Sequence, residues 1–249
     1  PNSNSGIDAT TRNITSGDGS ASSLNISDDV LTVTPKTDDT TAVFKVTDKD
    51  SNALLNVDSS SDLVRAGIGQ HIVNTNIKEF ALSSTAAFPD TADTWFGLFS
   101  STNYGTSNIL DLGTGSTPAV SYGIPDGSYT AMHVIKNYWY IPFNITIDSA
   151  NCWFANDTSG GDTVKFSVMS YAVVKGTGLT AGDLSSGIEH LLTSTPVSTV
   201  GGNRAYYLEL AEGAAGFDVD SGRVILACVA QDGTDADLTV NMQIVYHLR

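Results

Sequence analysis

The chain has 249 residues, with 12 Lys or Arg against 27 Asp or Glu, so its formal net charge is −15. This charge repels both nucleic-acid phosphates and anionic membrane surfaces, and we expect the chain to bind neither. Apolar residues make up 41% of the sequence, which is enough for a sizeable core. No apolar run approaches the roughly 20 residues that a membrane-spanning helix requires.

The composition favours strands and turns over helices. Only four of the acidic residues are Glu, a good helix former, and the others are Asp, which bonds its own backbone and prefers turns. We therefore predict an all-β chain. Cys152 and Cys228 lie in apolar, strand-like contexts, and two buried thiols are favoured over a disulfide.

Three segments of different composition follow one another along the chain. Residues 1–27 are too polar to bury much surface, and we predict an extended arm held by a neighbouring chain. Residues 28–69 carry short apolar pieces about every ten residues, separated by acidic or Ser-rich turns, which predicts a β-rich neck. Residues 70–249 form the predicted β-sandwich head.

The apolar pieces of the neck are too short and one-sided to make a core within one chain. We expect copies of the chain to pack around a common axis and bury Val43, Phe44, Leu54, Leu55, Leu63 and Val64. Residues 44–58, with the sequence FKVTDKDSNALLNVD, resemble the neck segments of phage tail fibres and other trimeric virion appendages. The resemblance implies a homotrimer attached to a virion.

In the head, residues 238–248 have the clearest pattern, with apolar and polar side chains alternating and Val245 as the exception. Residues 163–171 also alternate. Further strands are expected over residues 77–82, 95–99, 205–210 and 223–230.

Near residues 180–192, by contrast, Leu184, Ile188, Leu191 and Leu192 fall at helical spacing, which predicts one or two helical turns. Many short strands with turn signals between them indicate a sandwich or a jelly roll. This part of the chain resembles the jelly-roll heads of phage decoration proteins and fibre tips.

No motif indicates an enzyme. The sequence lacks the G-x-S-x-G elbow of a serine hydrolase, and His71, His133, His190 and His247 are scattered without a metal-binding spacing. The sequence does not exclude the paired carboxylates of a glycosidase, because these need to be close only in space and have no fixed sequence spacing. Turn chemistry already explains the many Asp residues. We expect no catalytic residues and no resident cofactor.

Two acidic stretches are candidate calcium sites. Residues 48–52 open like a calcium-binding loop but lack the later Gly and Glu of an EF-hand, and residues 232–237 gather three carboxylates. Turns account for both stretches without a metal, and this interpretation is favoured. The candidate ligands are Asp48, Asp50, Asn52, Asp232, Asp235 and Asp237.

A group of aromatic residues is a candidate sugar-stacking platform: Tyr138, Trp139, Tyr140 and Trp153. The favoured alternative is that these residues lie in the core and at a subunit interface. Only half of residues 138–143 can face one side of a strand, and Pro142 interrupts the hydrogen-bond ladder of that strand.

The favoured hypothesis is a non-enzymatic structural protein of a tailed-bacteriophage virion. It would be a homotrimer that projects from the particle as a decoration (cement) protein or a fibre, with its own copies and other virion proteins as partners. The alternative is a receptor-binding fibre tip that recognises host-surface glycan.

Overall fold

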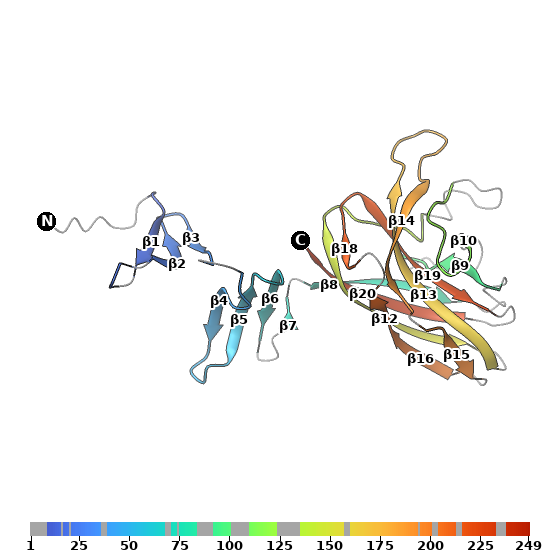
Figure 1. Ribbon diagram of the computed structural model, residues 1–249, viewed down its shortest axis with the longest axis horizontal. Coiled ribbons are helices and arrows are strands. Elements are labelled where there is room, and N and C mark those ends of the chain that lie inside the picture. Colours follow the sequence, from blue (N-terminus) through green and yellow to red (C-terminus); the bar gives the residue numbers. More distant parts are fainter. Residues whose placement is uncertain are drawn as a thin grey trace. The chain divides into compact units, whose positions relative to one another are not determined.

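The computed structural model consists of two compact units, Pro1–Asn74 and Thr75–Arg249, here called the N-terminal and C-terminal units (Figure 1). The sequence had suggested a boundary five residues earlier, at residues 69 and 70. The structure describes residues 9–15, 17–19, 21–35, 39–67, 71–73, 75–83, 92–100, 110–123, 135–156, 160–193, 195–200, 204–212, 216–232 and 238–249. All regular elements in these ranges are strands, which confirms the predicted all-β class.

The N-terminal unit holds two small antiparallel sheets in which each strand pairs with its neighbour along the chain. Sheet A consists of β1 (Arg12–Thr15), β2 (Ala21–Ile26) and β3 (Leu31–Val33). Sheet B consists of β4 (Phe44–Thr47), β5 (Ala53–Asp58), β6 (Leu63–Ala66) and β7 (His71–Ile72).

Strands β1 and β2 lie inside the segment that the sequence predicted as an extended arm. Amide side chains link them, since Asn13 Nδ2 donates to Ser22 O at 2.7 Å and to Asn25 Oδ1 at 3.1 Å. A hairpin satisfies its backbone hydrogen bonds locally, so a strand pair forms even where few apolar side chains are available.

Two larger antiparallel sheets form the C-terminal unit. Sheet C has the order β16 (Arg204–Glu209), β12 (Ile145–Asn156), β20 (Leu238–Leu248) and β8 (Thr75–Ser83), with β18 (Asp218–Val219) also on β12. Sheet D has the order β10 (Asp111–Thr114), β9 (Thr94–Gly97), β19 (Arg223–Gln231), β13 (Gly160–Val173), β14 (Leu184–Leu192) and β17 (Ala211–Glu212). Strand β11 (Trp139–Tyr140) pairs with β19, and β15 (Val197–Val200) pairs with β13.

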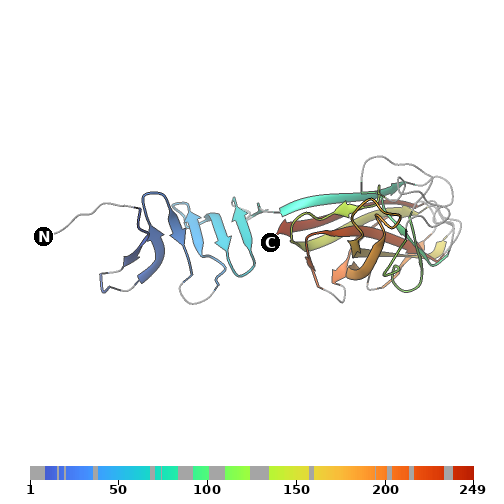
Figure 2. The same ribbon diagram turned by 90° about the horizontal axis from the view of Figure 1, so that it is seen from above.

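The main core lies between sheets C and D in a sandwich-like arrangement. Phe80, Phe154 and Met242 of sheet C belong to the same buried cluster as Phe166 and Val229 of sheet D. The rings of Phe154 and Phe166 meet at 5.1 Å between centroids. Figure 2 shows β8 and β20 running side by side along this unit.

A second apolar cluster covers the opposite face of sheet D. It contains Trp95, Leu110, Tyr171 and Cys228, and the Tyr171 hydroxyl donates to Ala119 O at 2.9 Å. Strand β19 is therefore buried on both faces from Val224 to Gln231.

The two cysteines lie in different apolar clusters. Cys152 belongs to the main core and Cys228 to the cluster on the other face of sheet D. Both are buried free thiols, as the sequence favoured, and burial raises the pKa of each.

The predicted helical turns over residues 180–192 are wrong, because Leu184–Leu192 form strand β14. The pairing of β14 with β13 is irregular between Val168 and Met169 and again between Ser170 and Ala172. Each irregularity shifts the alternation of inward and outward side chains, so the buried residues lose their period of two. The resulting spacing imitates that of a helix.

Candidate functional site

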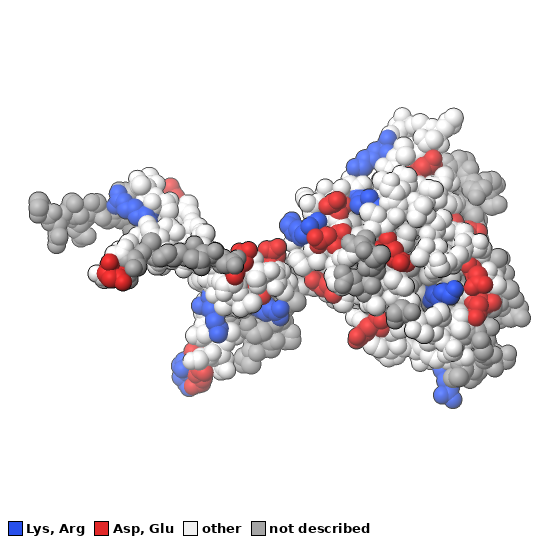
Figure 3. All heavy atoms as spheres, viewed as in Figure 1, with Lys and Arg blue, Asp and Glu red and all other residues white. Residues whose placement is uncertain are grey.

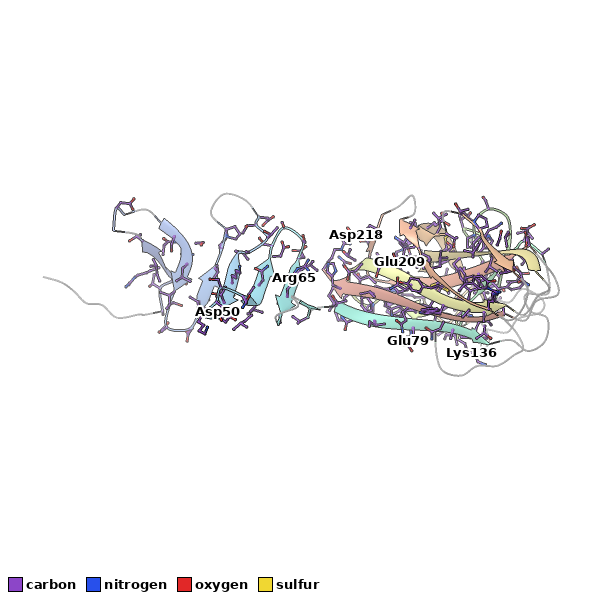
Figure 4. The ribbon with its side chains drawn as sticks, turned by 90° about the horizontal axis from the view of Figure 1, so that it is seen from below. Asp50, Arg65, Glu79, Lys136, Glu209 and Asp218 are labelled. Carbon is purple, nitrogen blue, oxygen red and sulfur yellow. The ribbon has the colours of Figure 1, made fainter. Side chains whose placement is uncertain are left out.

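Sheet B has one apolar face and one polar face. Partners across antiparallel strands share a face, so Phe44, Val57 and Val64 lie in one row, and Val46, Leu55 and Ala66 form a second row on the same side. The intervening row, on the other side, consists of Lys45, Asn56 and Arg65, of which Arg65 is labelled in Figure 4.

Sheet A repeats this arrangement on a smaller scale. Leu24 pairs with Val33 and Ile26 with Leu31, which gathers four apolar residues on one face, where Arg12 of β1 lies beside Ile26. The row between them holds Asn13, Asn25 and Thr32. Residues 31–33 belong to the segment predicted as a β-rich neck, whereas the alternation at residues 24–26 was not predicted because residues 1–27 are so polar.

Neither apolar face is buried by the residues that the structure describes. Every buried apolar residue of the described ranges belongs to the C-terminal unit, beginning at Phe80. In the N-terminal unit Phe44 is 39% exposed, Val46 40% and Leu31 60%. Figure 2 shows each of the two sheets as a single layer of strands. These faces are the candidate interaction surface.

The strand register places the residues expected at the subunit interface on both faces of sheet B. Phe44, Leu55 and Val64 lie on the apolar face of sheet B, whereas Leu54 and Leu63 lie on the polar face beside Asn56 and Asp58. Val43 comes just before β4, and its amide donates to Val57 O at 2.9 Å. The sequence analysis missed Val46, Val57 and Ala66, which a strict period of two within each piece would have found.

The first calcium candidate is a hydrogen-bonded turn between β4 and β5. Asp48 Oδ1 accepts hydrogen bonds from Asp50 N at 2.9 Å and Asn52 N at 2.8 Å, and Asp48 Oδ2 accepts from Asn52 Nδ2 at 2.9 Å. The hydrogen bonds from Asn52 lower the pKa of Asp48. The Asp50 carboxylate contacts Lys49 Nζ at 2.6 Å. Turn chemistry thus accounts for the spacing of these residues.

In the second candidate, both oxygens of Asp232 are occupied by Thr163, whose amide donates at 2.6 Å and whose hydroxyl donates at 2.7 Å. Asp235 and Asp237 lie outside the described residues. Within the described ranges no group of three or more His, Cys, Asp or Glu side chains is arranged to hold a metal ion.

The four aromatic candidates lie in separate environments. Trp139 packs on the core, with its ring centroid 4.8 Å from that of Tyr246 and 6.3 Å from that of Phe80. The Tyr138 hydroxyl donates to Gly182 O at 2.9 Å, and burial raises its pKa. Lys175 Nζ lies over the ring of Tyr140, 5.2 Å from the ring centroid.

Trp153 differs from these three residues because it is exposed on the outer face of sheet C. Its neighbour is Tyr207, which no sequence pattern had singled out.

A buried polar cluster in sheet D also escaped the sequence analysis. Ser170 Oγ lies 2.7 Å from His190 Nε2, and His190 Nδ1 lies 2.8 Å from Gly216 O. Arg223 Nε donates to the same Ser170 Oγ at 2.8 Å. Ser170 and His190 are both buried, so this Ser–His contact lacks the substrate access that a nucleophile needs, and it serves to join β13, β14 and β19.

Of the other histidines, only the side chain of His247 is described. His247 is buried and its Nδ1 lies 2.8 Å from Asp148 Oδ1 across β20 and β12. His71 is in β7, and His133 lies outside the described residues.

On the face in Figure 3, Lys and Arg side chains of the described residues are scattered among Asp and Glu and form no broad basic area. None of the described segments is a helix long and apolar enough to span a membrane.

No protein-family model matches the chain, and no curated protein is significantly similar to it. Function is therefore inferred from register, burial and charge.

Proposed function

We propose that this chain is a non-enzymatic structural subunit of a tailed-bacteriophage virion, and that it assembles as a homotrimer through sheets A and B. The observation that carries the proposal is the pair of single-layer sheets, each with an apolar face that stays unburied within the described chain. Burying a Val, Leu or Phe side chain contributes about 1.5–3 kcal/mol. Association of copies is the direct way to gain that free energy.

The width of sheet B favours three copies over two. Four strands spaced about 4.8 Å apart make a sheet roughly 15–19 Å wide. In a triangular prism of three such sheets the axis lies about 5 Å from each sheet, half of the roughly 10 Å that separates packed sheets. Side chains from three faces then meet at the axis. A two-sheet sandwich would leave the edges at β4 and β7 open, whereas a closed ring brings them together.

We further propose that the C-terminal unit is a jelly-roll head. The support is nested pairing: β8 pairs with β20, β9 with β19, β12 with β16, and β13 with β14. In this set the first strand along the chain pairs with the last and the second with the second last. A long hairpin wound into two sheets has this order, and jelly rolls of virion proteins are built from such double-sheet windings.

The resemblance of residues 44–58 to fibre necks directs the proposal to a virion, and the acidic exterior agrees with it. A net charge of −15 keeps crowded particle surfaces from sticking to one another. The chain would be located in the virion, with other capsid or tail proteins as partners.

Light scattering tests the trimer. The purified chain should have a mass of about three times 26.1 kDa. Val46→Asp introduces a charge on the apolar face and should reduce the mass to that of one chain. Lys45→Asp, a larger charge change at the adjacent residue on the polar face, is the matched control and should leave the mass unchanged. A monomeric wild-type chain, or a trimeric Val46→Asp variant, would contradict the proposal.

Antibody labelling tests the location. An antibody raised against residues 75–249 should decorate purified phage particles in electron micrographs, on the capsid for a decoration protein or on the tail for a fibre. Unlabelled particles that carry the gene would refute a virion location.

The alternative function, recognition of host-surface glycan by a fibre tip, has one observation in its favour: the exposed pair of aromatic rings on sheet C.

A further inference from the structure

The outer face of sheet C carries two aromatic rings side by side. Trp153 in β12 pairs with Tyr207 in β16, so both side chains point away from the core that Cys152 and Phe154 face. The ring centroids are 5.0 Å apart and the planes are tilted by 49°. Trp153 is 56% exposed and Tyr207 48% exposed, so neither ring is needed to fill the core.

Polar side chains surround the rings on the same face. Asn241 pairs with Trp153 from β20, and the next row on that side consists of Glu79, Gln243, Asn151 and Glu209. Figure 4 labels Glu79 on β8 and Glu209 on β16, at the two sides of the sheet. Amide and carboxylate groups thus lie within one residue row of the aromatic pair.

Hydrogen bonds hold part of this surface in place. The Tyr207 hydroxyl donates to Glu209 Oε1 at 3.0 Å and lies 3.2 Å from Asn151 Oδ1. The hydrogen bond to Glu209 raises the pKa of Tyr207. On the other side of the sheet, Gln243 Nε2 donates to Glu79 Oε1 at 3.2 Å. A surface fixed before binding loses less entropy when a ligand arrives.

We infer that this face is a binding platform for neutral oligosaccharides. A sugar ring has an apolar face of C–H groups, which packs on aromatic rings, and a rim of hydroxyls, which bonds amides and carboxylates. Two rows of outward residues form the platform: Glu79, Gln243, Asn151 and Glu209 in one, and Ala81, Asn241, Trp153 and Tyr207 in the other. These rows include two Glu and neither Lys nor Arg, so their charge favours neutral sugars over sialylated, sulfated or uronic ones.

The same residues argue against a second copy of the chain as the occupant. Two such faces brought together would bury Glu79 and Glu209 against the equivalent carboxylates, at a large desolvation and repulsion cost. The polar row of Glu79 and Gln243 separates the two rings from Ile77, which is 63% exposed, and its partner Val245, so the face lacks the continuous apolar area of a stable protein interface.

Glycan binding by the full-length chain tests the inference. The probe is an array of neutral oligosaccharides of glucose, galactose, N-acetylglucosamine and rhamnose, with sialylated and uronic-acid-containing counterparts. The strongest binder is then titrated by calorimetry. We expect neutral sugars to bind more tightly than their acidic counterparts, and Trp153→Ala to weaken binding by about tenfold or more. Tyr207→Ala should have a comparable effect, and Tyr207→Phe, which keeps the ring but loses the hydroxyl contacts, a smaller one of about threefold.

Phe143→Ala is the matched control, because Phe143 is 63% exposed and lies outside both strands. It should bind like wild type. The inference is overturned if no neutral oligosaccharide binds, or if Trp153→Ala and Tyr207→Ala both bind like wild type. It is also overturned if either variant changes the oligomeric mass, because the rings would then form a subunit contact. If Trp153→Ala fails to fold, Tyr207→Ala decides the matter. The trimer is measured separately by mass, so failure of one proposal does not affect the other.

Discussion

The two units of this chain are both built from antiparallel strands and Asp-rich turns, yet they differ in what the strands bury. In the C-terminal unit, apolar clusters cover both faces of sheet D, and β19 is buried along eight successive residues. The described apolar residues of the N-terminal unit are all at least partly exposed. The difference shows that hairpin pairing can satisfy the backbone without producing a core.

Topology is the physical cause of this difference. Sheets A and B are meanders whose strands pair with their chain neighbours, so no described strand of this unit forms a second layer over their apolar faces. In the C-terminal unit β8 pairs with β20 and β9 with β19, so distant segments come back to form a second layer. Long-range pairing of this kind makes a core but slows folding.

The largest expected effect separates the two units by their dependence on concentration. Residues 75–249 expressed alone should unfold cooperatively at a midpoint that is independent of protein concentration. Residues 1–74 should show a transition whose midpoint rises with concentration, because their burial comes from association. Thermal unfolding followed by circular dichroism across a hundredfold concentration range measures both. A concentration-independent transition for residues 1–74 would contradict the inference that their burial comes from association.

Truncation of one large side chain in each unit tests whether the two units have separate cores. Phe166 is fully buried, so Phe166→Ala should lower the free energy of unfolding of the C-terminal unit by about 3–5 kcal/mol. Phe44→Ala should leave that transition unchanged and instead shift the trimer toward single chains. Urea unfolding and light scattering give the two results, and equal losses in urea from both variants would count against separate cores.

A close backbone approach in the C-terminal unit predicts a smaller loss. A Cβ added to Gly187 would lie 2.8 Å from Tyr171 Cε1 and 2.8 Å from Val120 Cα, so Gly187→Ala should destabilise the unit by about 1–3 kcal/mol. Gly178 has no atom within 4 Å of such a Cβ, and Gly178→Ala is the matched control, expected within about 0.5 kcal/mol of wild type. Similar melting of the two variants would show that β14 and residues 110–123 separate easily.

The smallest expected effect is a pH dependence confined to the C-terminal unit. Burial lowers the pKa of His190, and nearby Arg223 lowers it further, although the contact with Gly216 opposes both. The unfolded chain then binds a proton that the folded chain refuses. The stability contribution is complete above the unfolded pKa of about 6.5 and is lost as the pH falls below it.

Urea unfolding between about pH 7.5 and pH 5.5 should show this loss, and His190→Gln should flatten the slope in that range. An equally steep slope in the variant would assign the dependence to other groups.

Sequence patterns predicted several of the longer strands. Residues 238–248 coincide with β20, and the expected strands near 77–82, 163–171, 205–210 and 223–230 correspond to β8, β13, β16 and β19. The failure at β14 has a local cause, because irregular pairing with β13 disrupts the alternation on which such predictions depend. The sequence could not show how the aromatic residues divide, because Trp139 and Trp153 are close in sequence, but one packs on the core and the other faces solvent.

The sequence by itself determined the all-β class, the acidic surface, the strands with clear alternation and the thin apolar content of the first segment. These properties follow from side-chain chemistry and from the two-residue period of a strand, which are local. Only the tertiary structure decided which apolar residues are buried and that Tyr207 lies beside Trp153. The second fact depends on strand register between segments more than fifty residues apart, and a shift of one residue in that register would turn every side chain of the strand to the other face.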